Sequence, residues 1–141
     1  HLVANYDILP SVLSQIGLAD RIPGKPRGPG RDFSPWLRGE QLEWEDVVFG
    51  EYGTSLRMIR TGRWKYVQRA DDGPWQLFEL EVDPGEKSNL YDSPEHADVQ
   101  ASLERRLHEF FDAYSEPLWN MWSPAGTSKH LHTKTRPSNL H

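Results

Sequence analysis

The spacing of apolar residues changes twice along this chain, from a helical period to strand-like runs and back again. Near the N-terminus the apolar residues recur at steps of three and four: Ile8, Leu9, Val12, Leu13 and Ile16. This spacing predicts a helix over residues 7–17, which Gly17 ends. Asp7 would be its N-cap and Pro10 would fall in the first turn, where a missing N–H costs little.

The middle of the chain reads as a loop followed by a small sheet. Residues 21–30 are rich in proline and glycine, which predicts a loop. Short apolar runs then predict an antiparallel sheet over residues 45–85. Val47, Val48, Phe49 and Tyr52 make a first run, and further strands are expected at 56–60, 64–68 and 75–82. Thr61 and Gly62 suit a two-residue hairpin loop, which would pair Ile59 with Trp64 and Arg57 with Tyr66. Apolar groups occur on both faces, so we expect both to be partly covered.

A second helix is predicted over residues 93–114. Ser93 is a suitable N-cap and Pro94 a suitable first helical residue. One stripe of the helix is apolar and the opposite side is charged, so the helix should pack across the sheet. The stripe consists of Val99, Leu103, Leu107, Phe110, Phe111 and Tyr114. Residues 115–141 are aromatic but irregular, and we expect an extended arm that lies on other protein.

Composition and charge exclude several classes of function. The 141 residues fit one domain. The net charge of −5 is spread over scattered acids and bases, which argues against a nucleic-acid partner. No apolar run reaches the roughly 20 residues of a membrane span. The chain has no cysteine, so disulfides, thiolate zinc sites and cysteine nucleophiles are excluded.

Four motifs follow one another in a fixed order. The first is Asp7-Ile8-Leu9-Pro10-Ser11 with Gly17-Leu18, and the second is GRDFSPWLRG at 30–39. The third is MIRTGRWKYV at 58–67, and the fourth, the most specific, is ELEVDPGEKSNL at 79–90. In this order they resemble the C-terminal portion of a formylglycine-dependent sulfatase of the alkaline phosphatase superfamily.

The resemblance implies an α/β fold of the alkaline phosphatase type, of which this chain would be the C-terminal α+β part. Residues 1–44 would be the end of the large catalytic domain, with its helix at 7–17, and a connecting loop. Residues 45–114 would form the C-terminal subdomain, with its sheet at 45–85 and its helix at 93–114. Residues 115–141 would be the extended arm.

The resemblance also implies hydrolysis of a sulfate ester or sulfamate. In this family a hydrated formylglycine attacks sulfur, and a divalent metal, usually calcium, offsets charge on the sulfate oxygens. The family's nucleophile motif and metal ligands lie upstream of where this chain begins, so we expect no catalytic residue and no metal ligand here. The expected partners are an upstream catalytic domain and a sulfated small molecule or carbohydrate, with a homo-oligomer contact through the arm.

Two groups of residues are candidates for substrate contact. Lys129, His130 and His132 in the arm would attract an anionic substrate. Glu51 and Tyr52 lie in the expected loop after the first strand, where binding residues are common. Two alternatives fit the same sequence: a non-catalytic carbohydrate-binding or oligomerisation module, and a phosphonate or phosphodiester hydrolase of the same superfamily.

Overall fold

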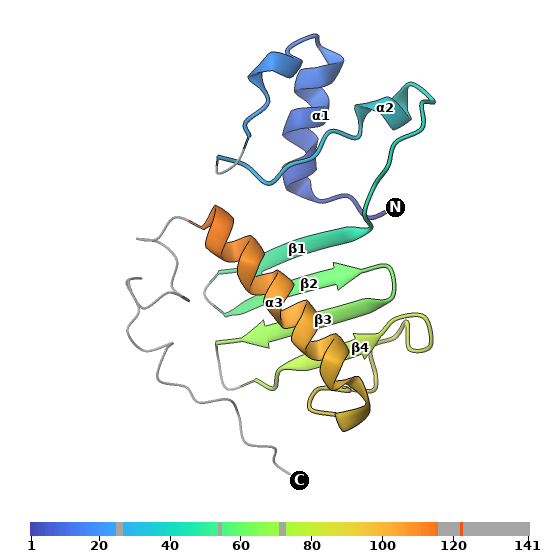
Figure 1. Ribbon diagram of the computed structural model, residues 1–141, viewed down its shortest axis with the longest axis vertical. Helices are drawn as coiled ribbons and strands as arrows, with labels where there is room; N and C mark the ends of the chain where they lie inside the picture. The colour runs from blue at the N-terminus through green and yellow to red at the C-terminus, as the bar shows by residue number, and fades with distance from the viewer. Residues whose placement is uncertain (25–26, 54, 71–72, 116–121, 123–141) are drawn as a thin grey trace.

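A computed structural model describes residues 1–24, 27–53, 55–70, 73–115 and 122. Its N-terminal part contains short helices, and a sheet and one long helix follow (Figure 1). In chain order the elements are η1 (Asn5–Asp7), α1 (Ile8–Gln15), η2 (Ala19–Arg21), α2 (Ser34–Leu37), β1 (Val47–Tyr52), β2 (Leu56–Thr61), β3 (Trp64–Arg69), β4 (Gln76–Glu79), η3 (Pro94–His96) and α3 (Ala97–Tyr114).

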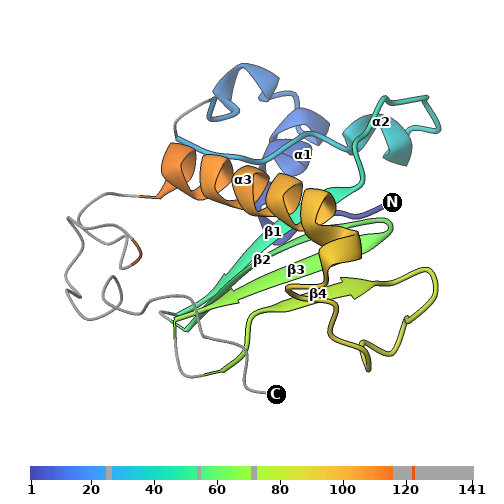
Figure 2. The ribbon, with the colours of Figure 1, turned by 60° about the horizontal axis from the view of Figure 1, so that its bottom comes forward.

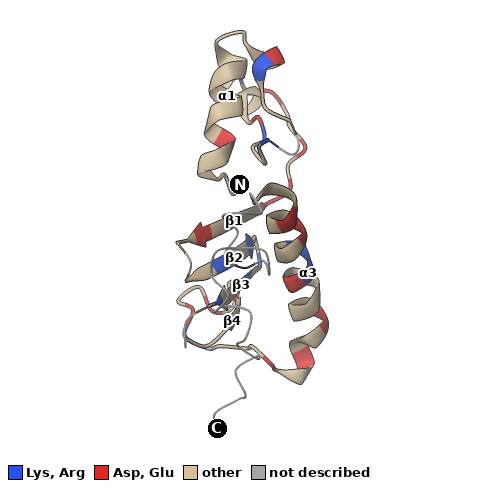
Figure 3. Ribbon diagram, turned by 90° about the vertical axis from the view of Figure 1, so that its left-hand side faces the viewer, with Lys and Arg blue, Asp and Glu red and all other residues tan. Residues whose placement is uncertain are grey.

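The four strands form an antiparallel sheet in the order β1-β2-β3-β4, and α3 crosses one of its faces (Figure 2). Seen along the sheet, α3 lies on one side of the strands (Figure 3), and its buried residues are Gln100, Leu103, Leu107 and Phe111. The core between the two layers contains Val47, Ile59, Tyr66, Leu77, Leu103, Leu107 and Phe111. The predicted α+β arrangement with a packed amphipathic helix is therefore confirmed.

The predicted hairpin register is wrong by two residues. Ile59 pairs with Tyr66, and Arg57 pairs with Gln68, so the loop residues are Gly62 and Arg63. The Thr61 hydroxyl accepts a hydrogen bond from the Trp64 amide at 2.9 Å, which makes Thr61 the last strand residue. A shift of two residues leaves each side chain on its predicted face. The expectation that both faces are covered is confirmed by Val67 and Phe78, which are buried on the face opposite α3.

Both edges of the sheet are capped by side chains or loop backbone. On β1, the Phe49 amide donates to the Tyr6 hydroxyl at 3.0 Å, and Arg31 Nη2 donates to the Val47 carbonyl at 3.0 Å. On β4, the Leu77 amide donates to Asn89 Oδ1 at 3.0 Å, and the Leu77 carbonyl accepts from the Leu90 amide at 2.8 Å. Capping of this kind blocks pairing with other chains.

Three predicted elements are shorter in the structure, and the first is the helix predicted over residues 7–17, which spans Ile8–Gln15. β4 spans Gln76–Glu79 rather than 75–82, because the Leu80 amide bonds to the Arg63 carbonyl and the Asp83 amide to the Glu79 carbonyl. The predicted helix at 93–114 begins as a 3₁₀ turn over Pro94–His96 and becomes α-helical from Ala97. A tight first turn is common at helix ends.

Helix α1 exposes the residues that its apolar spacing would bury. Ile8, Leu9, Val12 and Ile16 are 53%, 55%, 49% and 63% exposed, whereas the buried residues of the helix are Pro10 and Ser11. The described part of the chain therefore presents an unpaired apolar helix face. No described helix is both long and apolar enough to cross a membrane.

Candidate functional site

The N-terminal segment is tied to the sheet through Asp7 and Arg31. Asp7 is fully buried, and its carboxylate accepts hydrogen bonds from the Ala4 amide at 2.9 Å and the Arg31 amide at 2.8 Å. Asp7 is the N-cap residue of α1, as predicted, but its side chain makes no capping bond to the helix. The Arg31 guanidinium pairs with Asp7 Oδ2 at 3.2 Å and donates to the Glu45 carbonyl at 2.8 Å. These bonds fix the start of β1 relative to α1.

The first two motifs hold this junction together. The Ser11 hydroxyl donates to the Asp7 carbonyl at 2.7 Å and accepts from the Phe33 amide at 2.9 Å. Gly30 passes so close to Tyr6 that an added Cβ would lie 2.1 Å from the Tyr6 carbonyl oxygen. A serine hydroxyl and a glycine are thus required by packing at these motif positions.

The fourth motif joins β4 to α3. Asp83 Oδ2 accepts the amides of Lys87 and Ser88, both at 2.8 Å. The Asn89 side chain accepts the Leu77 amide and donates to the Trp75 carbonyl at 3.0 Å. The most specific part of the sequence resemblance is therefore a scaffold for the loop and contributes no reactive group.

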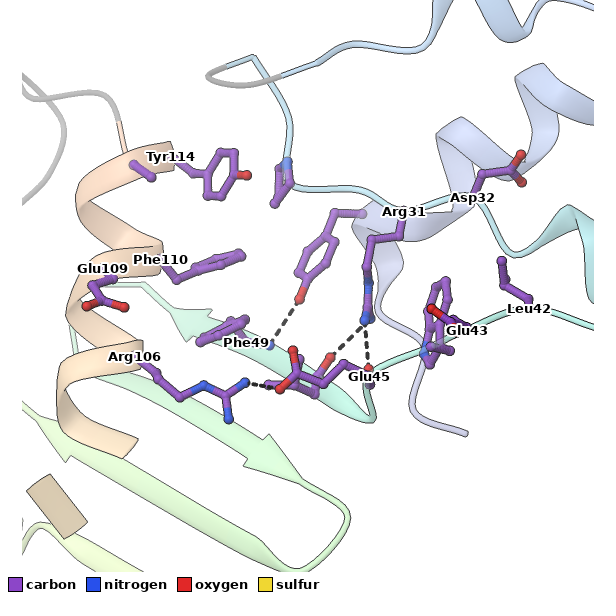
Figure 4. A pocket seen from close by; sticks show the side chains of 15 residues that line it. Arg31, Asp32, Leu42, Glu43, Glu45, Phe49, Arg106, Glu109, Phe110 and Tyr114 are labelled. Atoms are coloured by element: carbon purple, nitrogen blue, oxygen red, sulfur yellow. Dashed lines mark hydrogen bonds and ion pairs between the residues drawn. The ribbon is translucent and has the colours of Figure 1, made fainter. Parts of the chain in front are cut away.

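A cavity of about 630 Å³ lies between this junction and helix α3 (Figure 4). On its α3 side, Arg106 reaches across and donates to Glu45 Oε1 at 2.6 Å. On its opposite side the Arg31 guanidinium lies 3.8 Å from the centre of the Trp44 ring. Tyr6 also lines the cavity, and its hydroxyl accepts a hydrogen bond from the Phe49 amide at 3.0 Å.

Burial raises the pKa of Tyr6 above its ordinary value of 10.0, and the charge of Asp7 acts in the same direction. The hydrogen bond from the Phe49 amide and the charge of Arg31 oppose the increase. The phenol therefore stays protonated at neutral pH and can donate its proton to an acceptor in the cavity.

A second cavity of about 460 Å³ adjoins the first, and five residues line both: Tyr6, Pro29, Phe49, Phe110 and Tyr114. Its charged lining residues are Glu51 and Arg57. Arg57 is 4% exposed, its Nε donates to Glu51 Oε1 at 2.8 Å, and its guanidinium lies 4.1 Å from the Phe111 ring centre. Burial lowers the pKa of Arg57, while Glu51 and Asp112 act to raise it. We call the two cavities together the junction cleft.

The structure describes two of the five predicted substrate-contact residues. Glu51 and Tyr52 are the last residues of β1 and pair with Arg57 and Leu56, so their assignment to a loop is wrong. Glu51 lines the junction cleft, whereas Tyr52 is exposed and does not line it. Lys129, His130 and His132 lie outside the described residues.

Three cleft residues were not predicted from the sequence as site residues. Tyr6 lies in η1 and Arg106 lies in α3. No local sequence motif marks either of them as a site residue. Arg57 carries a usable signal, because strand alternation places it on the same face as Ile59 and Tyr66. An arginine at an inward position of a strand is uncommon unless it is paired.

The described residues provide neither the metal site nor the formylglycine that the sequence resemblance implies for the whole enzyme. Among them no group of three His, Asp or Glu side chains is arranged to hold a metal ion. The sequence contains no cysteine, so no cysteine-derived formylglycine can form within these 141 residues. What the junction cleft offers is binding, through aromatic rings, paired charges and the half-buried phenol of Tyr6.

Comparison with known proteins identifies the family. Residues 1–113 match the family described as N-sulphoglucosamine sulphohydrolase, C-terminal. The chain is 27% identical over 143 residues to the Delta 4,5-hexuronate-2-O-sulfatase of Bacteroides thetaiotaomicron, covering 94% of this chain and 28% of the relative. It is 35% identical over 106 residues to the choline-sulfatase of Rhizobium meliloti, covering 71% of this chain and 20% of the relative.

A solved structure with the same fold is the phosphonate monoester hydrolase of Agrobacterium radiobacter. It is 26% identical, with a TM-score of 0.62 over 75% of this chain and 24% of that one. The chain thus spans less than a third of each of these relatives. The match over residues 1–113 nevertheless confirms the resemblance, and the chain belongs to the N-sulphoglucosamine sulphohydrolase C-terminal family, among the sulfatases of the alkaline phosphatase superfamily.

Proposed function

We propose that this chain is the C-terminal part of a sulfatase that hydrolyses sulfate esters or sulfamates, and that it completes the fold and the substrate pocket without being catalytic itself. The match of residues 1–113 to the sulphohydrolase C-terminal family carries this proposal. Curated relatives that cover this chain are a hexuronate sulfatase and a choline-sulfatase. Nucleophile, metal ligands and leaving-group acid would come from the rest of the enzyme.

The exposed face of α1 is the proposed contact with that catalytic domain. Val12 and Ile16 expose about half or more of their surface, and Leu9 on the same helix does so too. Full burial of one such side chain, relative to full exposure, stabilises a protein by roughly 1.5–3 kcal/mol. The exposed face of α1 therefore favours a permanent apolar partner. Residues 1–44 would then belong with the large domain, residues 45–114 would be the C-terminal subdomain, and residues 115–141 the arm.

The proposed substrate contacts follow the same division. Glu51 lines the junction cleft, and we assign it a role on the substrate side of the subdomain. Tyr52, exposed one residue further, would contact substrate only across the boundary with the catalytic domain. Lys129, His130 and His132 in the arm would supply positive charge toward an anionic sulfate group.

Calcium and formylglycine belong to the proposed full-length enzyme. Calcium takes carboxylate and carbonyl oxygens as ligands, and the described residues of this chain hold no suitable group. A homo-oligomer contact through the arm is part of the same proposal.

The second candidate function is a hydrolase of the same superfamily that acts on a different class of ester. The structural likeness to the phosphonate monoester hydrolase of Agrobacterium radiobacter, at 26% identity, favours phosphonate or phosphate esters as alternative substrates. A likeness of fold does not fix the reaction.

Both candidates are tested by comparing the full-length enzyme with this chain alone. With calcium present, the full-length enzyme should hydrolyse an aryl sulfate faster than an aryl phosphonate, and the 141-residue chain should hydrolyse neither. Addition of the separately expressed upstream part should restore activity. Hydrolysis by the isolated chain would overturn the proposal, and faster phosphonate hydrolysis by the full-length enzyme would establish the second candidate.

A further inference from the structure

The junction cleft has the same polar arrangement at each end. In the first cavity Arg106 Nη2 lies 2.6 Å from Glu45 Oε1, and in the second Arg57 Nε lies 2.8 Å from Glu51 Oε1. Each pair combines a planar group of N–H donors with a carboxylate acceptor. Each end therefore offers donors and acceptors side by side, while the charges within each pair offset one another.

Aromatic rings occupy the middle of the cleft, where both cavities are lined by Tyr6, Phe49, Phe110 and Tyr114. The Phe49 and Phe110 rings are stacked, with centroids 3.9 Å apart. Tyr114, in the last turn of α3, lies 5.0 Å from Phe110, and its ring points into the cleft (Figure 4). The rings of Tyr6 and Tyr114 are tilted by 38° and 52° against Phe110, so the cleft has an aromatic strip of tilted rings between two polar ends.

The remaining charges of the first cavity do not suit a sulfate group. Its lining includes Asp32, Glu43 and Glu109 in addition to Glu45, against two arginines. Those arginines are already paired, Arg31 with Asp7 and Arg106 with Glu45. An additional anion would be repelled, so the sulfated part of a substrate belongs elsewhere.

We propose that the junction cleft binds an uncharged, unsulfated stretch of an oligosaccharide substrate, at least one sugar unit away from the sulfate that is removed. A sugar hydroxyl donates and accepts hydrogen bonds at once, which matches the Arg–Glu pair at each end. The C–H face of a pyranose ring is apolar and matches the aromatic strip. Cavities of about 630 and 460 Å³ are within the size range of small-molecule sites.

This inference rests on the proposed function and narrows it, since it makes the substrate a sulfated oligosaccharide rather than a small sulfate ester. An organic cation is the competing ligand, because aromatic rings and carboxylates also attract cations. Asp32, Glu43 and Glu109 give the first cavity an excess of negative charge that would also attract a cation, so choline is the competitor in the test. Beside the aromatic strip the geometry favours the sugar, because Glu45 and Glu51 are each held by an arginine.

Binding is tested on the full-length enzyme by titration calorimetry with tetra-N-acetylchitotetraose (hereafter chitotetraose), an uncharged oligosaccharide of N-acetylglucosamine, and separately with choline chloride. We expect chitotetraose to bind and choline not to bind. Arg106→Met keeps the aliphatic stem but removes the donors, and Tyr114→Ala removes a ring. Each should raise the Kd for chitotetraose about tenfold, the effect of losing one good hydrogen bond or ring contact.

Arg105→Met is the matched control. Arg105 neighbours Arg106 on α3 but does not line the cleft, so its replacement should change the Kd less than about twofold. Absence of chitotetraose binding, equal binding by all variants, or binding of choline in its place would overturn the inference. These readouts do not depend on hydrolysis, so a failure of the proposed function is recognised separately, as an enzyme that cleaves no sulfate ester.

Activity provides a second test with the same variants. For a sulfated tetrasaccharide, Arg106→Met and Tyr114→Ala should raise KM about tenfold and leave kcat unchanged. For the corresponding sulfated monosaccharide, which is too short to reach the cleft, KM should not change. An equal increase of KM for both substrates would show that the residues act only through the fold.

Discussion

Arg31 and the fully buried Asp7 connect the two parts of the chain by an ion pair that also satisfies backbone groups. Arg31 Nη2 lies 3.2 Å from Asp7 Oδ2, and the Arg31 amide donates to Asp7 Oδ1 at 2.8 Å. The same guanidinium donates to the carbonyls of Glu45 and Val47, immediately before and at the start of β1. A single side chain thus positions α1 and the sheet relative to each other.

Replacement of Arg31 by Met should therefore destabilise the protein by about 3 kcal/mol, because it leaves the fully buried Asp7 carboxylate without its counter-charge. The measurement is urea-induced unfolding followed by circular dichroism. Asp7→Asn combined with Arg31→Met should cost less than the two single changes added together. Arg21→Met is the control, since the exposed Arg21 side chain pairs with the exposed Asp20, and its replacement should change stability by about 0.5 kcal/mol or less.

Sequence pattern predicted the layers of this fold well and the junction poorly. The stripe that includes Leu103, Leu107 and Phe111 follows from helical spacing alone, and strand alternation places Ile59 and Tyr66 on the buried face. The hairpin register failed because the Thr61 side chain, which accepts the Trp64 amide, ends the strand one residue later than the glycine signal suggests. Side-chain bonds of this kind are not visible in hydrophobic spacing.

The candidate site was missed for a related reason. The junction cleft is formed by Tyr6, Glu51 and Arg106, which are separated by more than forty residues from one another along the chain. No local sequence motif indicates that residues so far apart in the chain meet in one cleft. The motifs that carried the family resemblance, including Asp7, Gly30 and Asn89, maintain backbone geometry instead.

Gly30→Ala should be strongly destabilising. The new methyl group would lie 2.1 Å from the Tyr6 carbonyl oxygen and 2.9 Å from Pro10 Cγ. Neither the Tyr6 backbone nor the Pro10 ring can move without disturbing the junction. We expect a loss of about 2–3 kcal/mol in the free energy of unfolding, typical of overpacking. Gly24→Ala lies in the same proline-rich loop and serves as the control, because its Cβ would have no atom of the described residues within 4 Å apart from its chain neighbours. Equal unfolding midpoints for the two variants would contradict the close approach.

The Tyr6 phenol should make the protein sensitive to alkali. Burial raises its pKa above 10.0 in the folded state, so folding favours the protonated form. Its stabilising contribution is complete below the unfolded value and is lost as the pH rises through the folded pKa. The difference in tyrosinate absorbance between wild type and Tyr6→Phe, followed against pH, should show a phenol that ionises above pH 10.0. Ionisation at or below that pH would contradict burial of the hydroxyl.

The apolar face of α1 provides the most direct test of the proposed union with a catalytic domain. Val12 is 49% exposed in this chain, so Val12→Asp should leave its unfolding within about 0.5 kcal/mol of wild type. In the assembled enzyme the same aspartate would be buried without a partner, which costs several kcal/mol. Co-purification of this chain with the separately expressed upstream part should then fall by at least about tenfold. Gln15→Glu adds one negative charge to the same helix without replacing an apolar side chain, and should leave co-purification unchanged; equal loss in both variants would assign the effect to charge rather than to the apolar face.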